Sequence, residues 1–438
     1  MIVKKRMSVL AGVSLSSAVL LSACGGNEES GASENGSSNS SSSEDTVTIE
    51  IFQGKVEFRD QFLELAERYQ EENPDVQIEF SAVGGGSDYF TSLRSRFSSG
   101  DEPDVFSLAG PSELEDYVDY VEDLSDMEVT EAALEGTLDG ITQDETVYGI
   151  PFNQEGYGFI YNKAVFEEAG VDAESIQSYA DLEEAVQTLD EQKEELGIEG
   201  VFALPGAEAW VMGNHLANVY LQGEFNGDVM EAYESPSVSF EEGDQFQQML
   251  DLQQEYSIQP VLNMDYSQQV EQYFSLGSAA VIQQGDWIYP TLQQMDPEFA
   301  DNNVGIMSIP LEGEEGKVPV GVPNYWVINK NSDAEVVEAS KDFFNWMYTS
   351  EEGIEVVQEL LNFIPAHENF DPEAIASSLS RDIYEKSLEG ETIGWAFLGY
   401  PTAWGDDLGA YTQEYMAGER EWQEVEEAAI AEWEERRQ

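Results

Sequence analysis

The segment "TVTIEIF" (residues 46–52) combines β-branched and apolar residues in a short run, which is typical of a buried β-strand. Directly after it, apolar residues recur at helical spacing: Phe58, Phe62, Leu65, Ala66 and Tyr69. A strand therefore leads into an amphipathic helix, and this pair sets the pattern for the rest of the chain.

The same alternation continues downstream. "NPDVQIEFSAV" (73–83) predicts a turn and a second strand, "SDYFTSLRSRFSSG" (87–100) a helix that ends at Gly100, and "PDVFSL" (103–108) a third strand. Further on, Ser178 and Asp181 have the spacing of a capping box at the start of another helix. Alternating strands and helices predict an α/β fold with a largely parallel sheet covered by helices.

The first 44 residues have a different character. Lys4, Lys5 and Arg6 precede an apolar run (7–21) and two small residues, which is the pattern of a secretory signal. The run is shorter than the ~20 residues of a membrane-spanning helix. Cys24, the only cysteine, follows at once, and a Ser-, Gly- and Glu-rich linker occupies 25–44. We expect residues 1–23 to be a signal peptide and the remainder to be exported.

Charge is the outlier in the composition. Without the three basic residues of the signal, 15 basic residues face 89 acidic ones. Such a surface repels itself unless salt shortens the Debye length to ~3 Å near 1 M, so we interpret it as adaptation to a saline habitat. The lack of a basic stripe argues against nucleic acid as a partner.

Five motifs in order carry a resemblance over nearly all of residues 46–438. They are "SGDEPDVF" (99–106), "YGIPFNQEGYGFIYNKAVFEEAGV" (148–171), "YFSLGSAAVIQQGDW" (273–287), "VGVPNYWVINKNS" with "ASKDFFNWMYTSEEG" (320–353), and "FIPAH" (363–367). In these motifs the chain resembles the extracellular solute-binding proteins of the maltose-binding type, the receptors of ABC sugar importers. Val281 departs from the family pattern, which has methionine there.

The resemblance implies two α/β lobes joined by hinge strands, with the ligand in the cleft between them. The first lobe would comprise residues 45–152 and 318–366, and the second 153–317 and 367–438. "LSAC" (21–24) also resembles a bacterial lipobox, which implies that Cys24 is lipid-modified. Two acyl chains give stable anchoring, so we expect the receptor to be held at the outer face of the cell membrane, near its permease. We also expect the receptor to be a monomer.

A sugar site needs flat aromatic platforms and fixed hydrogen-bonding groups. Five tryptophans lie among Gly, Pro and Asn in or beside expected loops, where they either contact ligand or pack: Trp210, Trp287, Trp326, Trp395 and Trp404. The remaining three, Trp346, Trp422 and Trp433, have helical positions that favour packing.

The polar candidates come from the same loops. Side-chain amides and carboxylates suit sugar hydroxyls because they form paired hydrogen bonds. The candidates are Gln53, Glu57, Asp88, Tyr89, Gln154, Asp286 and Asn324, with Asn153 and Asp406 as further options. "GGGSD" (84–88) lacks the Lys-Ser or Lys-Thr of a nucleotide-binding loop, so we expect no cofactor there.

Two other functions stay open at this point. A carbohydrate hydrolase would use two carboxylates, which are too abundant here to be informative. Among motifs of other enzymes, Gly-x-Ser-x-Gly and His-Glu-x-x-His are absent, and His215 and His367 lack the spacing of metal ligands. A cationic ligand such as a polyamine would use carboxylates and aromatic faces. We expect a sugar-binding protein without catalytic activity, metal or cofactor.

Overall fold

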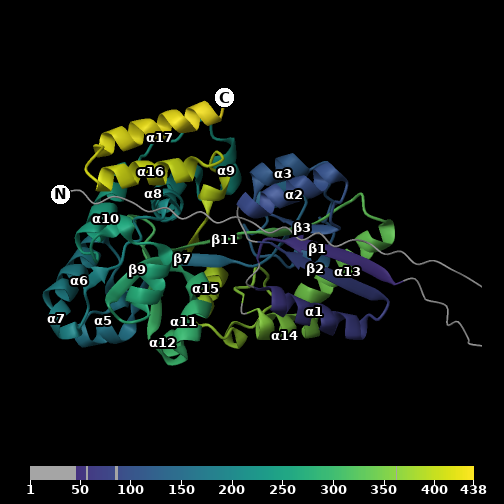
Figure 1. The fold of residues 1–438 in the computed structure, drawn as a ribbon, viewed down its shortest axis with the longest axis horizontal. Helices are drawn as coiled ribbons and strands as arrows, with labels where there is room; N and C mark the ends of the chain where they lie inside the picture. Colours follow the sequence, from purple (N-terminus) through teal and green to yellow (C-terminus); the bar gives the residue numbers. More distant parts are fainter. Residues whose placement is uncertain (1–45, 56–57, 84–86, 362) are drawn as a thin grey trace, which may run out of the picture. The chain divides into compact units, whose positions relative to one another are not determined.

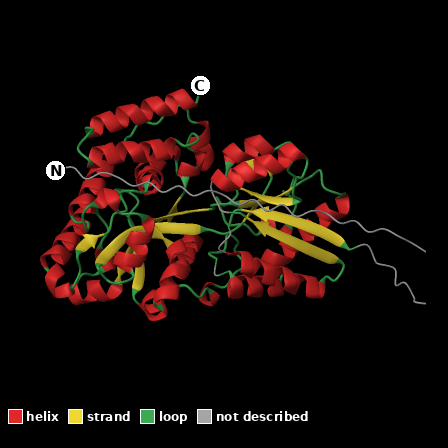
Figure 2. Cartoon of the chain, in the orientation of Figure 1, coloured by secondary structure: helices red, strands yellow, loops and turns green. Residues whose placement is uncertain are grey.

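A computed structural model describes residues 46–55, 58–83, 87–361 and 363–438. The predicted signal peptide, Cys24 and the linker lie outside these residues, as does Glu57. Residues 45–438 form one compact unit. Two sheets organise this unit (Figures 1 and 2).

The first sheet confirms the three strands expected between residues 46 and 108. Its strand order is β2-β1-β3-β12-β6. The strands are β1 (Val47–Gln53), β2 (Val76–Ala82), β3 (Val105–Leu108), β6 (Ile150–Pro151) and β12 (Tyr325–Ile328). β1 pairs in parallel with both β2 and β3, whereas β12 runs antiparallel to β3 and β6. The carboxyl ends of β1, β2 and β3 therefore share one edge of the sheet.

Helices cover both faces of the first sheet (Figure 1). α1 (Arg59–Glu72) buries Phe62, Leu65, Ala66 and Tyr69 against one face, as the helical spacing predicted. The other helices of this lobe are α2 (Ser87–Ser99), α3 (Pro111–Tyr117), α4 (Glu128–Glu131), α13 (Ala334–Thr349) and α14 (Glu351–Leu360). A small hairpin, β4 (Thr142–Gln143) with β5 (Thr146–Val147), completes it.

The second sheet has the order β13-β11-β7-β9-β8, and β10 also pairs with β7. Its strands are β7 (Glu155–Asn162), β8 (Gly200–Phe202), β9 (Ala279–Gly285), β10 (Val304–Met307), β11 (Val318–Gly321) and β13 (Thr392–Ile393). β7 is the central strand and is buried along most of its length. The motifs at 148–171 and 273–287 thus meet as neighbouring antiparallel strands, with Tyr157 opposite Gly285.

Helices surround the second sheet. They are α5 (Lys163–Ala169), α6 (Tyr179–Glu191), α7 (Lys193–Leu196), α8 (Ala217–Leu221), α9 (Val229–Glu234), α10 (Gly243–Glu255), α11 (Tyr289–Met295), α12 (Pro297–Asn302), α15 (Ser378–Glu389), α16 (Trp404–Met416) and α17 (Trp422–Arg436). The capping box predicted at Ser178 is present at the start of α6. Trp422 and Trp433 are buried, which confirms that they pack. No helix in the described part of the chain is both long and apolar enough to cross a membrane.

The chain passes between the two sheets at three places. β6 leads to β7, β11 leads back to β12, and the segment after α14 leads to α15 in the second lobe. β11 pairs with β7 at Gly156 and Glu155, so this strand belongs to the second sheet. These crossings place residues 152–155 and 320–324 at the junction of the lobes, where the candidate site is found.

Candidate functional site

A charged group joins the two sheets. Lys55 lies just beyond the end of β1, and its Nζ is 2.7 Å from Oε1 of Glu155, the first residue of β7. The backbone N–H of Gly156 donates to Oδ1 of Asp286, which follows β9, at 2.9 Å. Burial and the neighbouring Glu155 carboxylate raise the pKa of Asp286 well above its ordinary value, while Gly156 and Lys55 oppose that shift. Two carboxylates and one ammonium group therefore meet at the lobe junction.

An aromatic cluster surrounds His215 in the second lobe. The His215 ring stacks on Tyr157 with a centroid distance of 4.3 Å and an interplanar angle of 9°. Four further rings have centroids 4.9–6.0 Å from His215: Trp210, Trp287, Trp395 and Phe397. His215 is on the π-helical segment Val211–Leu216, and its ring packs against Tyr157 of β7 and against Trp287, just after the end of β9. Burial lowers the pKa of His215 to about 3, so the ring is neutral near neutral pH.

Several members of this aromatic cluster are partly exposed: Trp210, Trp287 and Phe397. Their polar atoms have fixed partners in two cases: Trp287 Nε1 donates to Gln284 Oε1 at 2.9 Å, and Trp210 Nε1 donates to Glu208 Oε2 at 3.1 Å. These bonds fix the planes of the two indoles. Flat, oriented and accessible aromatic faces suit the apolar C–H faces of a ring-shaped ligand.

A cavity of about 250 Å³ lies beside the aromatic cluster and is lined by residues of both lobes. Ala109, Ser112 and Glu113, after β3 and in α3, line it from the first lobe. Asn214 and Phe397 line it from the second lobe. We call this cavity, the aromatic cluster and the Lys55–Glu155–Asp286 group the cleft. Its position at the carboxyl ends of β1 and β3 is where open α/β sheets bind ligands.

The structure brings several predicted residues together. Trp210, Trp287 and Trp395 belong to the aromatic cluster, and Asp286 belongs to the charged group. Gln154 lies one residue before Glu155, and its Oε1 is buried without a hydrogen-bond partner among the described residues. Of the further options, Asp406 lines the cavity of about 250 Å³, and the Oδ1 of Asn153 is buried and unpartnered within the described residues.

Two predicted tryptophans lie elsewhere, and for them the prediction of a ligand contact is wrong. Trp326 is 1% exposed because its position in β12 turns it into the core against Phe152, and its Nε1 donates to Tyr348 Oη at 3.0 Å. Trp404 is fully buried at the start of α16, and its Nε1 donates to the Ala429 carbonyl at 2.8 Å. Both indoles hold the cores of their lobes together.

For two polar candidates, the prediction of a ligand contact is also wrong. Tyr89 is buried and stacked on Phe52, and its hydroxyl donates to the Ser107 carbonyl at 2.9 Å. The Gln53 amide is buried. Its Nε2 donates to the Lys55 carbonyl, and its Oε1 accepts from the Lys55 backbone N–H, so Gln53 fixes the loop that carries the Lys55 ammonium group.

The other polar candidates stay predictions. Asn324 is partly exposed, and its carbonyl accepts from Phe152 N at 3.0 Å. Asp88 is in α2, and its side chain is outside what the structure describes. Glu57 is likewise outside the described residues.

Several residues of the cleft escaped the sequence analysis, among them Lys55, Glu155 and His215. Lys55 had a usable signal, since it is one of few cations and follows the first strand directly. Glu155 had no distinguishing signal, because it is one of 89 acidic residues in the chain. His215 has no local signal in the sequence, because its neighbours in space come from distant segments.

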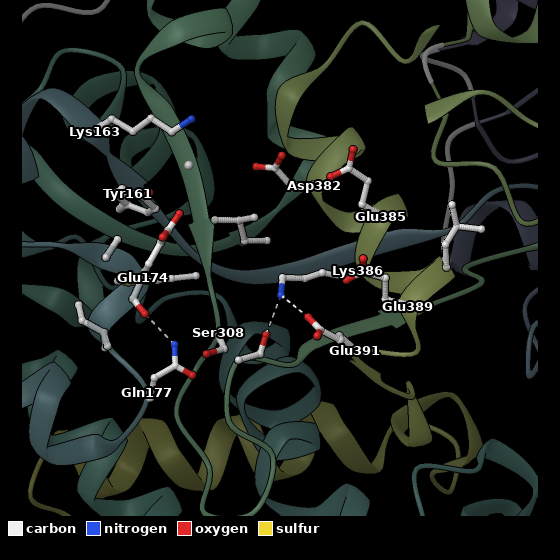
Figure 3. Close-up of a pocket in the computed structure, with 17 residues that line it drawn as sticks. Tyr161, Lys163, Glu174, Gln177, Ser308, Asp382, Glu385, Lys386, Glu389 and Glu391 are labelled. Carbon is white, nitrogen blue, oxygen red and sulfur yellow. Dashed lines mark hydrogen bonds and ion pairs between the residues drawn. The ribbon is translucent and has the colours of Figure 1, made fainter. Parts of the chain in front are cut away.

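The largest of the described cavities, about 750 Å³, is a groove on the second lobe alone (Figure 3). Its walls come from β7, β10, α5, α15 and neighbouring loops, and many of its side chains are acidic. Lys386 crosses the groove and donates to the Gly316 carbonyl at 3.0 Å and to Glu391 at 3.3 Å. Since first-lobe residues are missing from its lining, this groove is not the cleft. Among the described residues, no group of three or more His, Cys, Asp or Glu side chains is arranged to hold a metal ion.

Known proteins share this architecture. The multiple sugar-binding protein of Streptococcus mutans is 25% identical over 364 residues, which cover 79% of each chain. Among solved structures, a chitin oligosaccharide binding protein aligns with a TM-score of 0.71 and 19% identity, over 90% of this chain and 99% of the other. RafE in complex with raffinose aligns with a TM-score of 0.68 and 20% identity, over 90% and 100% of the two chains. These structures confirm the predicted two-lobed α/β fold.

The sequence profile of one family matches residues 55–354, which is more than half of the chain. The match spans the loop after β1, the central strand β7 and the motif that ends at Trp287. It confirms the resemblance found in the five motifs. The chain belongs to the family of bacterial extracellular solute-binding proteins.

Proposed function

We propose that this protein binds a mono- or oligosaccharide outside the cell and delivers it to the permease of an ABC importer. The observation that carries the proposal is the cleft, where oriented aromatic rings around His215 adjoin the carboxylates of Glu155 and Asp286. Aromatic faces match the C–H faces of a pyranose, and carboxylates accept bonds from its hydroxyls. The names of the relatives, which bind multiple sugars, chitin oligosaccharides or raffinose, support the same ligand class.

The mechanism that we propose is lobe closure. Ligand in the cleft would contact residues of both lobes, with Lys55 on one side and Trp287 on the other. A ligand shifts an open–closed equilibrium only by its differential affinity for the two forms, so these two-sided contacts favour the closed form. The lobes would correspond to residues 45–152 with 318–366 and 153–317 with 367–438, apart from β11, which pairs with β7. The permease would recognise the closed form, and the receptor would act as a monomer.

A thermal-shift panel of neutral sugars tests the ligand class. Purified protein in molar sodium chloride is mixed with galactose, melibiose, raffinose, stachyose and chitin oligosaccharides, and the melting temperature is compared with that of the free protein. Because ligand binds the folded state, a sugar at one hundred times its Kd adds about 2.7 kcal/mol of stability. If no sugar raises the melting temperature, the result contradicts the proposal.

We further propose that binding occurs without chemistry on the sugar. The support is the family, whose members are named for solute binding. Incubation of the protein with the same oligosaccharides, followed by chromatography of the products, should return them intact. Cleavage in the presence of the wild-type protein and not of an Asp286→Asn variant would establish a hydrolase instead.

We also propose that Cys24 carries the lipid anchor of the exported protein. The support lies in the sequence alone: a basic start, an apolar run and small residues precede the only cysteine. Cys24→Ser should release the protein from the membrane fraction. Full retention of that variant in the membrane fraction would contradict the anchor.

A further inference from the structure

A chain of buried amide groups leads from Trp287 to the backbone of the second sheet. Trp287 Nε1 donates to Gln284 Oε1 at 2.9 Å, and Gln284 Nε2 donates to Gln269 Oε1 at 2.7 Å. Gln269, on the π-helical segment Gln268–Phe274, donates in turn from Nε2 to the Ala203 carbonyl at 2.7 Å. Gln284 and Gln269 are only 1% and 0% exposed. Ala203 directly follows β8, so the chain ends on a rigid element.

The two amides can be oriented in one way only. The indole N–H of Trp287 donates and never accepts, so Gln284 must turn its oxygen toward Trp287 and its nitrogen toward Gln269. The Ala203 carbonyl accepts and never donates, so Gln269 has the same direction. The three bonds therefore point one way along the chain, and hydrogen bonds arranged like this strengthen one another. A change at Gln269 should reach the indole through Gln284.

Packing limits the position of the indole without setting its rotation. A Cβ on Gly285 would lie 2.2 Å from Cζ3 of Trp287, so the ring lies directly over the backbone of this glycine. The His215 ring lies on another side, with its centroid 5.3 Å from that of Trp287. Trp287 remains partly exposed, so part of its ring is accessible. The bond to Gln284 is the directional contact that selects one rotation of the ring.

We propose that Gln284 and Gln269 are positioning residues of the cleft, which hold the Trp287 indole at the angle where its accessible face stacks on the sugar. Because the indole N–H is already bonded to Gln284, Trp287 offers the ligand its face and no hydrogen bond. Gln269 is fully buried, so it acts through Gln284 and does not touch the ligand. A side chain held in place before binding spares the ligand the cost of ordering it. This inference rests on the proposed function and adds residues behind the ligand-contacting surface.

The neighbouring residue of β9 provides a matched control. Gln283 is 2% exposed and points to the opposite face of the sheet from Gln284. It accepts from Gln253 Nε2 at 3.1 Å and donates to the Val211 carbonyl at 3.0 Å, so this second chain does not lead to the indole. Gln253 is 1% exposed and, like Gln269, pairs a buried amide with a glutamine of β9. Gln253→Met keeps the bond from Gln283 to Val211 in place.

Calorimetry with the sugar that gives the largest thermal shift tests the effect on binding. Gln269→Met and Gln253→Met each remove one buried amide and keep the length of the side chain, so both should lower the melting temperature by a similar amount. Gln269→Met should weaken sugar binding about fivefold, because the ligand must then order the indole. Gln253→Met should leave the affinity unchanged. Gln284→Met is a second variant, which breaks the chain at the indole itself and should weaken binding at least as much as Gln269→Met.

Nuclear magnetic resonance measures the hydrogen bond of the indole without any ligand. In protein made with isotope-labelled tryptophan, the indole N–H resonance of Trp287 is the one that is missing from a Trp287→Phe variant. Its chemical shift depends on the hydrogen bond to Gln284. Gln284→Met and Gln269→Met should both shift this resonance, and Gln253→Met should leave it in place. A role of Gln269 in packing alone would not move it.

The results separate the inference from the function on which it rests. If a sugar binds the wild type and Gln269→Met with equal affinity, the glutamines do not position Trp287 for binding, and the receptor function stands. Equal losses of affinity in Gln269→Met and Gln253→Met would indicate a general effect of packing and would also overturn the inference. If no sugar binds the wild type, the proposed function fails. A shifted indole resonance in Gln269→Met would then still support the glutamines as the residues that hold Trp287, and an unshifted one would overturn that as well.

Discussion

Lys55 and Glu155 are one hundred positions apart in the sequence, and their side chains form an ion pair of 2.7 Å between the end of β1 and the beginning of β7. Their side chains are only 19% and 14% exposed. This pair is a direct electrostatic link between the two sheets, and it lies beside the buried carboxylate of Asp286.

Lys55→Met should therefore impair both stability and binding. It leaves Glu155 and Asp286 facing each other without a cation, and loss of one partner of a mostly buried ion pair costs about 3–5 kcal/mol. Chemical denaturation should detect this loss, and calorimetry should show sugar affinity reduced at least tenfold. Arg59→Met is the control, because Arg59 and Asp60 form an exposed pair that should contribute less than about 1 kcal/mol. If the two variants lose equal stability and equal sugar affinity, the Lys55–Glu155 pair contributes no more than an exposed ion pair.

Trp287→Ala and Trp326→Ala should separate binding from stability. Trp287 is partly exposed in the aromatic cluster, so its removal should weaken sugar binding at least tenfold and change the melting temperature little. Trp326 is surrounded by Phe62, Phe152 and Phe344, and its removal should cost about 3–5 kcal/mol of stability because it leaves a cavity. Calorimetry measures the sugar affinity of both variants, and urea denaturation measures their stability. A Trp287→Ala variant with wild-type affinity would remove this residue from the site.

The contrast between these two tryptophans explains why the site was only partly predictable. The strand–helix alternation, the five motifs and the helical spacing of Phe62, Leu65 and Tyr69 were enough to predict the fold. Trp326 and Trp287 have similar neighbours in sequence, but Trp326 is inside a strand opposite Ser107, and its side chain falls on the core face. Which face a strand residue takes depends on register, and a single sequence seldom fixes register.

The charged group escaped prediction for a related reason. Lys55, Glu155 and Asp286 meet only because β6 leads to β7 and β7 pairs with β9, which are long-range contacts. In a chain with 89 acidic residues, the functional carboxylates have no distinguishing local pattern. Loop position and residue type were therefore enough to predict Asp286 as a site residue, but not its two partners.

The raised pKa of Asp286 predicts a pH-dependent stability. An aspartate has a pKa of about 3.9 in an unfolded chain, and the folded state raises that of Asp286 by burial and by Glu155. The folded state then binds more protons than the unfolded state above about pH 4, so this residue destabilises the fold as the pH rises toward its folded pKa. Asp286→Asn, which stays neutral, should gain stability over the wild type at pH 8 and little at pH 4.5.

Thermal unfolding at the two pH values, in the same molar salt, measures this difference. Asp406→Asn is the matched control, since Asp406 is an exposed residue that lines the cavity of about 250 Å³ and the substitution makes the same chemical change. A wild type and Asp286→Asn that respond identically to pH would show that Asp286 titrates normally.

Salt should distinguish a neutral ligand from a cationic one. The described surface is strongly acidic, and any cation is attracted to it over roughly 10 Å at 0.1 M salt but over only ~3 Å at 1 M. A neutral sugar has no such long-range attraction, so its affinity should change less than threefold between 0.5 and 3 M sodium chloride. The affinity of spermidine, measured in parallel, should fall steeply if it binds at all. Calorimetry at both salt concentrations, with circular dichroism to verify that the protein stays folded, tests this. A strong spermidine signal that weakens with salt, together with no response to raffinose or chitin oligosaccharides, would replace the sugar by a polyamine as the ligand.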